Sequence, residues 1–185
     1  IASFILEQNV LITTVVVGRK GRDFMIRSGQ ELRAEFTQLG DRPSIVDIQP
    51  ITHIVIDDYT NGLIDEVYVS YTRFVNTMNQ RPVLWRLLPI EPTAIEPGQN
   101  VEYIYEPSPA EVLAELLPRF VEKELYHVIL EAVASEQSAR MVAMRSATDN
   151  AKEIIEELTL TYNKVRQEMI TKELLDIVGG VAALG

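Results

Sequence analysis

Cysteine is absent from the sequence, and so are long apolar runs and a recognisable leader. Without cysteine the chain can form no disulfide, no zinc site with thiolate ligands and no thiol nucleophile, which suits a reducing compartment. No apolar run approaches the roughly 18 to 20 residues of a membrane span, and no signal peptide opens the chain. The first residues, IASFILEQN, lack an initiator methionine and look like the end of a helix. We therefore interpret the sequence as a fragment.

Positive charge is also in short supply. The 185 residues include 17 Lys and Arg against 27 Asp and Glu, which gives a formal net charge of -10. A general nucleic-acid binder needs a basic face that releases counterions from phosphates, so no nucleic-acid partner is expected. With 46% hydrophobic residues, the chain is long enough for one domain with an appendage or for two small units.

Sequence motifs for nucleotide binding are weak. Gly18, Lys20 and Gly21 follow a predicted strand, where a phosphate could bind. The segment lacks the spacing and the GK[ST] ending of a P-loop, and the sequence has no GxGxxG motif. We favour a structural turn with a solvated basic rim, and we expect no cofactor.

Candidate catalytic and metal-binding side chains are equally sparse. His53 and His127 lie far apart, and neither has a histidine or carboxylate at metal-binding spacing on a clear shared face. Each is expected to be an ordinary packed or surface histidine. Asp57 and Asp58 are adjacent, so on a helix they point apart, and a solvated helix face is the simpler interpretation. The serines lie in no nucleophile elbow. No catalytic or metal site is predicted.

Residues 1–107 hold most of the glycines and prolines and mix strand-like with helix-like segments. The β-branched run at 11–18 predicts a strand buried on both faces, and alternation at 65–76 predicts another that forms a hairpin with 83–90. Helices are predicted at the segment after Gly18, ending near Gly29, and at 51–62. Strands mixed with helices imply a small α/β sheet domain over 1–107.

Residues 108–185 follow a different pattern. Ser108 is a predicted N-cap and Pro109 a first helical residue, which gives a short helix. Residues 119–178 then contain neither glycine nor proline. A helix of that length is about 90 Å long, whereas a compact protein of this size is roughly 40 Å across. A long helix that its own domain cannot cover is therefore expected.

The long helix carries an apolar seam. Two series that each repeat every seven residues, starting at Leu130 and Ala134, contain ten apolar residues among 14 positions, as in a coiled coil. The predicted seam residues are Met141, Met144, Ile155, Leu158, Tyr162 and Val165. The stripe then shifts to Ile170, Leu174, Ile177 and Val181, which indicates a different partner near the end. From periodicity alone, a homodimeric coiled coil is an equally good explanation of the seam.

Several sequence segments are similar to those of a known family. The matching segments are ASEQSARMVAM (134–144), ATDNA (147–151), YNKVRQ (162–167), ITKE (170–173) and IVGG (177–180), preceded by VGRKGRDF (17–24) and YIYEPSP (103–109). In these segments the sequence closely resembles the gamma subunits of F-type ATP synthases, and the similarity runs through the whole chain.

The resemblance implies a fold and a set of partners. It implies a small Rossmann-like sheet domain followed by one very long C-terminal α-helix that forms half of an antiparallel coiled coil. The implied partners are the alpha, beta and epsilon subunits, the membrane c-ring, and the chain's own missing N-terminal helix. The implied role is a non-catalytic central-stalk rotor. The family's first sheet strand, which is central, is also missing here, so a gap in the sheet is expected.

The resemblance also implies contact residues and a location. Contacts with the catalytic ring fall on Arg166, Gln167, Thr171 and Glu173, an apolar bearing tip on Ile177, Val178, Val181 and Leu184, and a foot that faces the c-ring and epsilon on Tyr103, Tyr105 and Glu106. The absence of the cysteine-bearing insert of chloroplast relatives favours a bacterial origin. The resemblance then implies a peripheral protein on the cytoplasmic side of a bacterial inner (plasma) membrane. The alternatives are a free-standing coiled-coil adaptor with an α/β head and, more remotely, an α/β enzyme.

Overall fold

The structure is a computed structural model that describes residues 4–5, 10–91 and 105–184, without the side chains of 182–184. It divides into two compact units, Ile1–Gln137 and Ser138–Gly185. The first unit therefore contains the predicted sheet domain and the first part of the long helix. This unit extends beyond the predicted division at residue 107.

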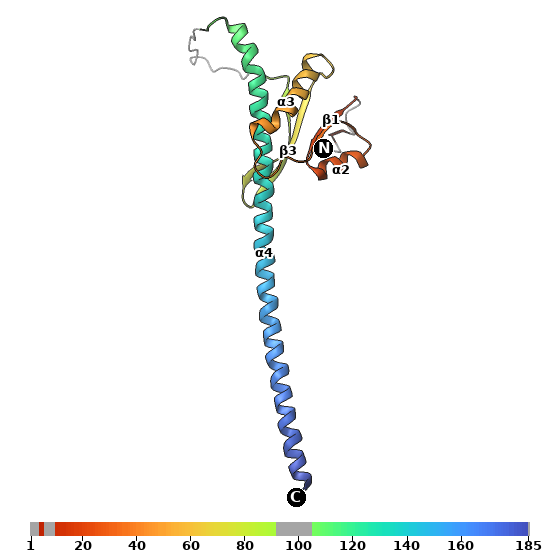
Figure 1. The fold of residues 1–185 in the computed structure, drawn as a ribbon, viewed down its shortest axis with the longest axis vertical. Helices are drawn as coiled ribbons and strands as arrows, with labels where there is room; N and C mark the ends of the chain where they lie inside the picture. Colours follow the sequence, from red (N-terminus) through yellow and green to blue (C-terminus); the bar gives the residue numbers. More distant parts are fainter. Residues whose placement is uncertain (1–3, 6–9, 92–104, 185) are drawn as a thin grey trace. The chain divides into compact units, whose positions relative to one another are not determined.

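The first unit begins with a parallel β–α–β arrangement (Figure 1). Strand β1 (Thr13–Val17) pairs in parallel with β2 (Glu31–Phe36), and helix α2 (Arg19–Arg27) connects them. The predicted strand and helix are confirmed, but the prediction that the strand is buried on both faces is wrong. Val16 is buried, whereas Val17 is 42% exposed, because β1 pairs only with β2 among the described residues and α2 covers one side.

Helix α3 (Ile45–Thr60) starts six residues before the predicted position, because Ser44 caps it. The backbone N–H and the hydroxyl of Ser44 both donate to Oδ2 of Asp47, at 2.8 and 2.7 Å, and these bonds lower the pKa of Asp47. The helix ends at Asn61 and Gly62, where φ of Gly62 is 69°, as the Asn-Gly signal predicts.

Strands β3 (Val67–Asn76) and β4 (Asn79–Leu88) form the predicted antiparallel hairpin. Among the described residues this pair shares no ladder with β1 and β2, so there are two two-stranded sheets instead of one continuous sheet. A discontinuity in the sheet is what the family resemblance implies. Helix α4 (Pro109–Leu184) follows as the last element.

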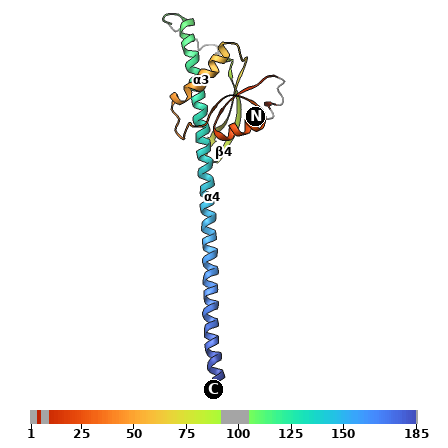
Figure 2. The ribbon, with the colours of Figure 1, turned by 45° about the vertical axis from the view of Figure 1, so that its right-hand side comes forward.

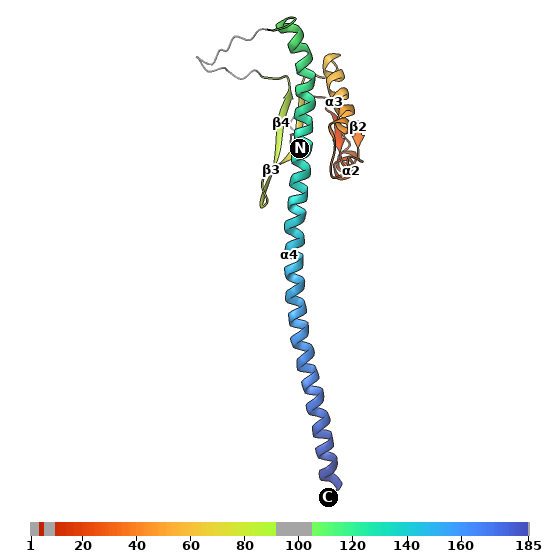
Figure 3. The same ribbon diagram turned by 60° about the vertical axis from the view of Figure 1, so that its left-hand side comes forward.

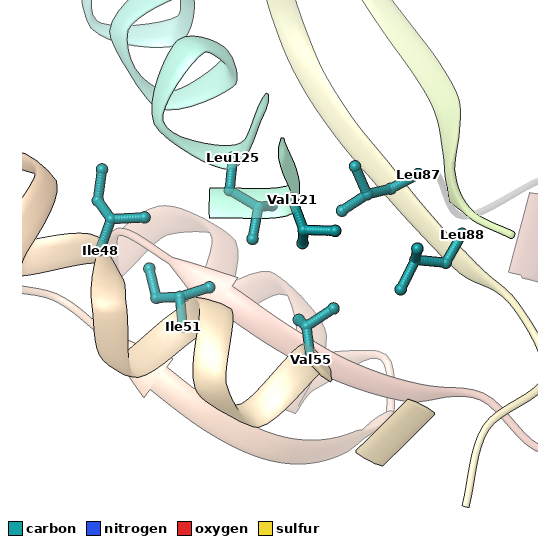
Figure 4. Packing of buried hydrophobic residues seen from close by; sticks show 7 residues of the cluster. All are labelled: Ile48, Ile51, Val55, Leu87, Leu88, Val121 and Leu125. Carbon is teal, nitrogen blue, oxygen red and sulfur yellow. The ribbon is translucent and has the colours of Figure 1, made fainter. Parts of the chain in front are cut away.

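The core of the first unit joins three elements (Figure 4). Helix α3 supplies Ile48, Ile51 and Val55, strand β4 supplies Leu87 and Leu88, and α4 supplies Val121 and Leu125. Figure 2 shows α3 crossing the first part of α4, and in Figure 3 the hairpin lies on one side of this part while α3 lies on the other. The start of α4 is thus held between the two layers by apolar burial.

Helix α4 is one helix of 76 residues, where a short helix followed by a long one was expected. Pro118 lies inside it and is exposed. Proline removes one helical hydrogen bond, which leaves the carbonyl of Ala114 without its usual donor. Because residue 114 is also exposed, water can hydrate this carbonyl, and the helix continues.

A charge pair ties β2 to α3 and provides a test of the fold. Nε and Nη2 of Arg33 each donate to a carboxylate oxygen of Asp58 at 3.1 Å, and this bond raises the pKa of Arg33. The Asp58 side chain is 13% exposed and that of Arg33 is 53% exposed. We expect Arg33→Ala to lower the free energy of unfolding measurably, because it leaves a mostly buried carboxylate without its partner.

Urea denaturation of the purified full-length protein measures this loss. The exposed Arg42 provides the matched control, and Arg42→Ala is expected to change the free energy of unfolding by less than about 0.5 kcal/mol. Equal losses in the two variants would show that the Arg33–Asp58 pair does not stabilise the fold.

Candidate functional site on the long helix

The predicted seam is exposed in the second unit. Met141, Met144, Ile155, Leu158, Tyr162 and Val165 are 47–66% exposed. Over residues 139–181, the described side chains are all exposed except Asn163, which is intermediate. Large apolar side chains in this number are typical of a binding surface. The second unit therefore presents a continuous helix whose apolar stripe has no cover within that unit.

The seam begins in the first unit on the side of α4 that faces away from the core. Successive helical residues are turned by about 100°, which places Leu130 and Ala134 roughly opposite Val121 and Leu125. Val121 and Leu125 are 3% and 6% exposed, whereas Leu130 is 38% exposed. The first part of α4 thus has one face for its own core and another for a partner.

The apolar side chains of the predicted bearing tip are exposed. Ile177, Val178 and Val181 of the predicted bearing tip are 64–68% exposed, and the side chain of Leu184 lies outside the described residues. Gly179 and Gly180 lie between them, with open space where a Cβ would be. The tip is therefore an apolar surface with a flat patch at the two glycines.

The four predicted ring contacts divide between two faces of α4. Gln167 and Thr171 line one shallow hollow, together with Lys164, Glu168, Lys172 and Leu175. The Thr171 hydroxyl donates to the Gln167 carbonyl at 2.9 Å, so towards a partner it can only accept. Arg166 and Glu173 do not line this hollow, because they lie about 100° or more around the helix from Gln167 and Thr171. They are seven residues apart, so they share another face of α4.

The predicted foot is only partly described. Tyr105 is 46% exposed and Glu106 is exposed, while Tyr103 lies outside the described residues. The assignment of this segment as a contact surface stays a prediction.

The glycines after β1 have structural roles, which agrees with the preferred interpretation. Gly18 has φ 96°, a conformation that other residues rarely adopt. A Cβ on Gly21 would lie 2.9 Å from Cγ1 of Val16, so glycine here allows α2 to pack against β1. Both glycines are thus explained without a bound phosphate.

Two predictions, one about Asp58 and one about His127, need correction. Asp58 is not on a solvated face, because it is 9% exposed and paired with Arg33, while Asp57 is exposed. His127 does have a carboxylate neighbour, since its Nε2 lies 3.8 Å from Oε1 of Glu131, one turn further on.

Among the described residues no group of three or more potential ligands could hold a metal ion. In the described part of the chain, no helix has the length and apolar character needed to cross a membrane.

A model of the family described as ATP synthase matches residues 3–184. The chain belongs to the ATP synthase family. The ATP synthase gamma chain of Dehalococcoides mccartyi is 63% identical to it over 182 residues, which cover 98% of this chain and 64% of that relative. The gamma chain of Roseiflexus sp. is 56% identical over 178 residues, covering 96% and 61%. The chain thus spans less than two thirds of the length of these relatives.

Solved structures in the ATP synthase family share the fold. A chain of the Euglena gracilis mitochondrial ATP synthase, in a structure of its OSCP, F1 and c-ring, superimposes with a TM-score of 0.63 at 20% identity, covering 99% of this chain and 66% of that chain. A chain of the rotor of the same enzyme gives a TM-score of 0.59 at 17% identity, covering 91% and 67%. The small sheet domain with a long C-terminal helix is therefore a fold of this family.

Proposed function

We propose that this chain is the central-stalk rotor subunit of an F-type ATP synthase. In this role it couples proton-driven rotation of a membrane c-ring to conformational changes in catalytic beta subunits. The observation that carries the proposal is the exposed apolar stripe of α4, in a chain that matches gamma chains along 96–98% of its length. The chain itself is non-catalytic, and the ATP chemistry belongs to its partners.

The two parts of the stripe fit two kinds of partner. The seam from Met141 to Val165 pairs with the N-terminal helix of the same protein in an antiparallel coiled coil. The shifted tip around Ile177 turns inside a ring of alternating alpha and beta subunits. The foot at Tyr105 and Glu106 contacts epsilon and the c-ring, which places the protein at the cytoplasmic side of a bacterial inner membrane.

Asymmetry gives this arrangement its mechanism. A single helical rod has different side chains on each face, so each of three catalytic subunits around it meets a different surface. A rod orientation can shift the conformation of a subunit only through contacts that differ in free energy between the conformations. Rotation of the rod then moves this difference from one subunit to the next.

Reconstitution tests the proposal. The purified full-length protein is expected to hydrolyse no ATP alone, and to form a complex with alpha and beta subunits that hydrolyses ATP in continuous turnover. A free-standing adaptor would neither assemble with these subunits nor change their turnover. Steady ATP hydrolysis by the protein without alpha and beta subunits would contradict a non-catalytic role.

A further inference from the structure

Helix α2 is strongly basic, although the chain as a whole is acidic. Within nine positions it has four basic residues and one acidic residue, whereas the formal net charge of the chain is -10. One of the four, Arg22, is paired within the first unit. Its Nη2 lies 2.8 Å from Oδ1 of Asp23, and its Nη1 lies 3.6 Å from Oε1 of Glu35. Only part of the positive charge of α2 is therefore balanced by its neighbours.

The other three basic side chains of α2 are exposed. Arg19, Lys20 and Arg27 form no ion pair with any residue that the structure describes. Phe24 lies four residues after Lys20 and three before Arg27, so these three side chains share one face of the helix and form the basic row of α2. Phe24 is 42% exposed. An exposed aromatic ring beside cationic side chains, arginine among them, is typical of a protein-binding surface.

The packing of α2 does not require the charges of this row. Met25, the buried residue of the helix, is 7% exposed and lies about 100° or more around the helix from each member of the row. Gly21 is the residue that meets β1, since a Cβ there would lie 2.9 Å from Cγ1 of Val16. The charges of Lys20 and Arg27 are thus available to a partner outside the first unit.

Within the first unit, α2 and the start of α4 lie at opposite ends. In Figures 1 and 3, α2 lies away from the green start of α4, where the predicted foot is located. Strands β1 and β2 pack against the core through Val15 and Phe36, so α2 belongs to the same body as the first part of α4. In the proposed rotor the foot faces the membrane, and α2 then faces the ring of alpha and beta subunits.

We propose that the basic row of α2 binds a carboxylate-rich protein segment on the surface of the alpha–beta ring that faces the sheet domain. Cations without partners in their own chain attract carboxylates, and this complementarity selects the partner and speeds the encounter. The inference rests on the proposed rotor function. Because α2 lies beside α4 and not on its axis, the row meets one part of the ring at a time, and the sheet domain adds to the asymmetry of the shaft.

Carbodiimide coupling tests the contact directly, because it joins a lysine amine to a neighbouring carboxylate as an amide and releases the reagent as a urea. In the complex of the full-length protein with alpha and beta subunits, mass spectrometry is expected to find Lys20 joined to an acidic peptide of alpha or beta. Lys20→Arg keeps the charge but lacks the amine, so it is expected to assemble normally without this cross-link. An unmodified complex in which Lys20 is joined to neither subunit would overturn the proposal.

Charge reversal tests the electrostatic part of the proposal. Lys20→Glu with Arg27→Glu is expected to slow assembly with alpha and beta subunits about three- to tenfold at about 0.1 M salt. The difference is expected to vanish near 1 M salt, where the Debye length falls from about 10 Å to about 3 Å. Arg119→Glu with Lys123→Glu makes the same change of charge at exposed positions near the start of α4, and it is expected to assemble at the unmodified rate. Equal rates in the two double variants would contradict a role of the basic row.

Two further outcomes separate this contact from a lipid site and from the proposed function. The full-length protein is expected not to bind phosphatidylglycerol vesicles through α2. Vesicle binding that Lys20→Glu with Arg27→Glu removes would assign the row to anionic lipid and overturn the proposal. If the unmodified protein does not assemble with alpha and beta subunits, the rotor function itself fails, whereas normal assembly without the Lys20 cross-link removes only the contact at α2.

Discussion

Replacement of Ile155 and Leu158 by aspartate is expected to abolish the paired helix and, with it, stable assembly of the enzyme. Both residues belong to the seam, and they are 63% and 62% exposed in the second unit. Because neither side chain is buried within its own unit, the substitutions are expected to weaken only the pairing with the partner helix. Burial of two such side chains contributes about 3–6 kcal/mol, and two carboxylates in an apolar seam add a further penalty.

Leu160 provides a matched control for this experiment. It is also an exposed leucine, at 72%, and it lies only two residues further along the same helix. At about 100° per residue it lies on the opposite side of α4 from the seam. Circular dichroism of the full-length protein is expected to show a helical melting temperature lowered by 10 °C or more, as an order of magnitude, in the double variant and little change in Leu160→Asp. Equal effects would contradict a seam on one face.

The sequence was sufficient for the elements whose patterns are local. The alternation in β3 and the Asn-Gly stop of α3 depend on neighbouring residues, and both predictions are confirmed. The start of α3 lies earlier than predicted because it is set by the Ser44–Asp47 cap, whose spacing is visible in the sequence. The sequence did not predict that α4 continues through Pro118. A helix can contain a proline where the carbonyl that loses its helical donor is exposed to water, and this exposure depends on the tertiary structure.

Long-range partners were the harder part of the prediction. Asp58 looked like half of an exposed acidic pair, and only the proximity of β2 shows that Arg33 neutralises it. Ser135 gave no signal either, since its hydroxyl donates to the Thr72 carbonyl, 63 positions away in the sequence. The seam, by contrast, was predictable because helical periodicity determines which side chains share a face.

Removal of Arg166 and Gln167 together is expected to lower ATP turnover at saturating ATP by about three- to tenfold in the assembled enzyme. The two residues are adjacent, so their side chains point about 100° apart on α4. In the proposed rotor, three catalytic subunits surround the helix at 120° intervals, so two such residues would face different subunits. Each can therefore bind one neighbour at one rotor angle and lose that contact at the next.

The expected fold change in turnover depends on how much the free energy of each hydrogen bond differs between two rotor orientations. A hydrogen bond to a charged partner contributes about 1.5–3 kcal/mol, but only the difference between two orientations affects turnover. A difference of about 1 kcal/mol corresponds to roughly a fivefold change. Hydrolysis at limiting ATP, where a single site acts alone, is expected to change little in Arg166→Ala with Gln167→Ala.

The tip supplies the comparison for this prediction. Val181 is 68% exposed and belongs to the predicted apolar bearing. Val181→Ile keeps an apolar, β-branched side chain there, so this variant is expected to turn over normally. Arg166→Ala and Gln167→Ala as single variants are expected to give smaller effects than the double variant, because each leaves one neighbour in contact. If the polar variants were silent and Val181→Ile were strongly impaired, the division into polar ring contacts and an apolar bearing would be reversed, and the fit of the tip in the ring would control turnover.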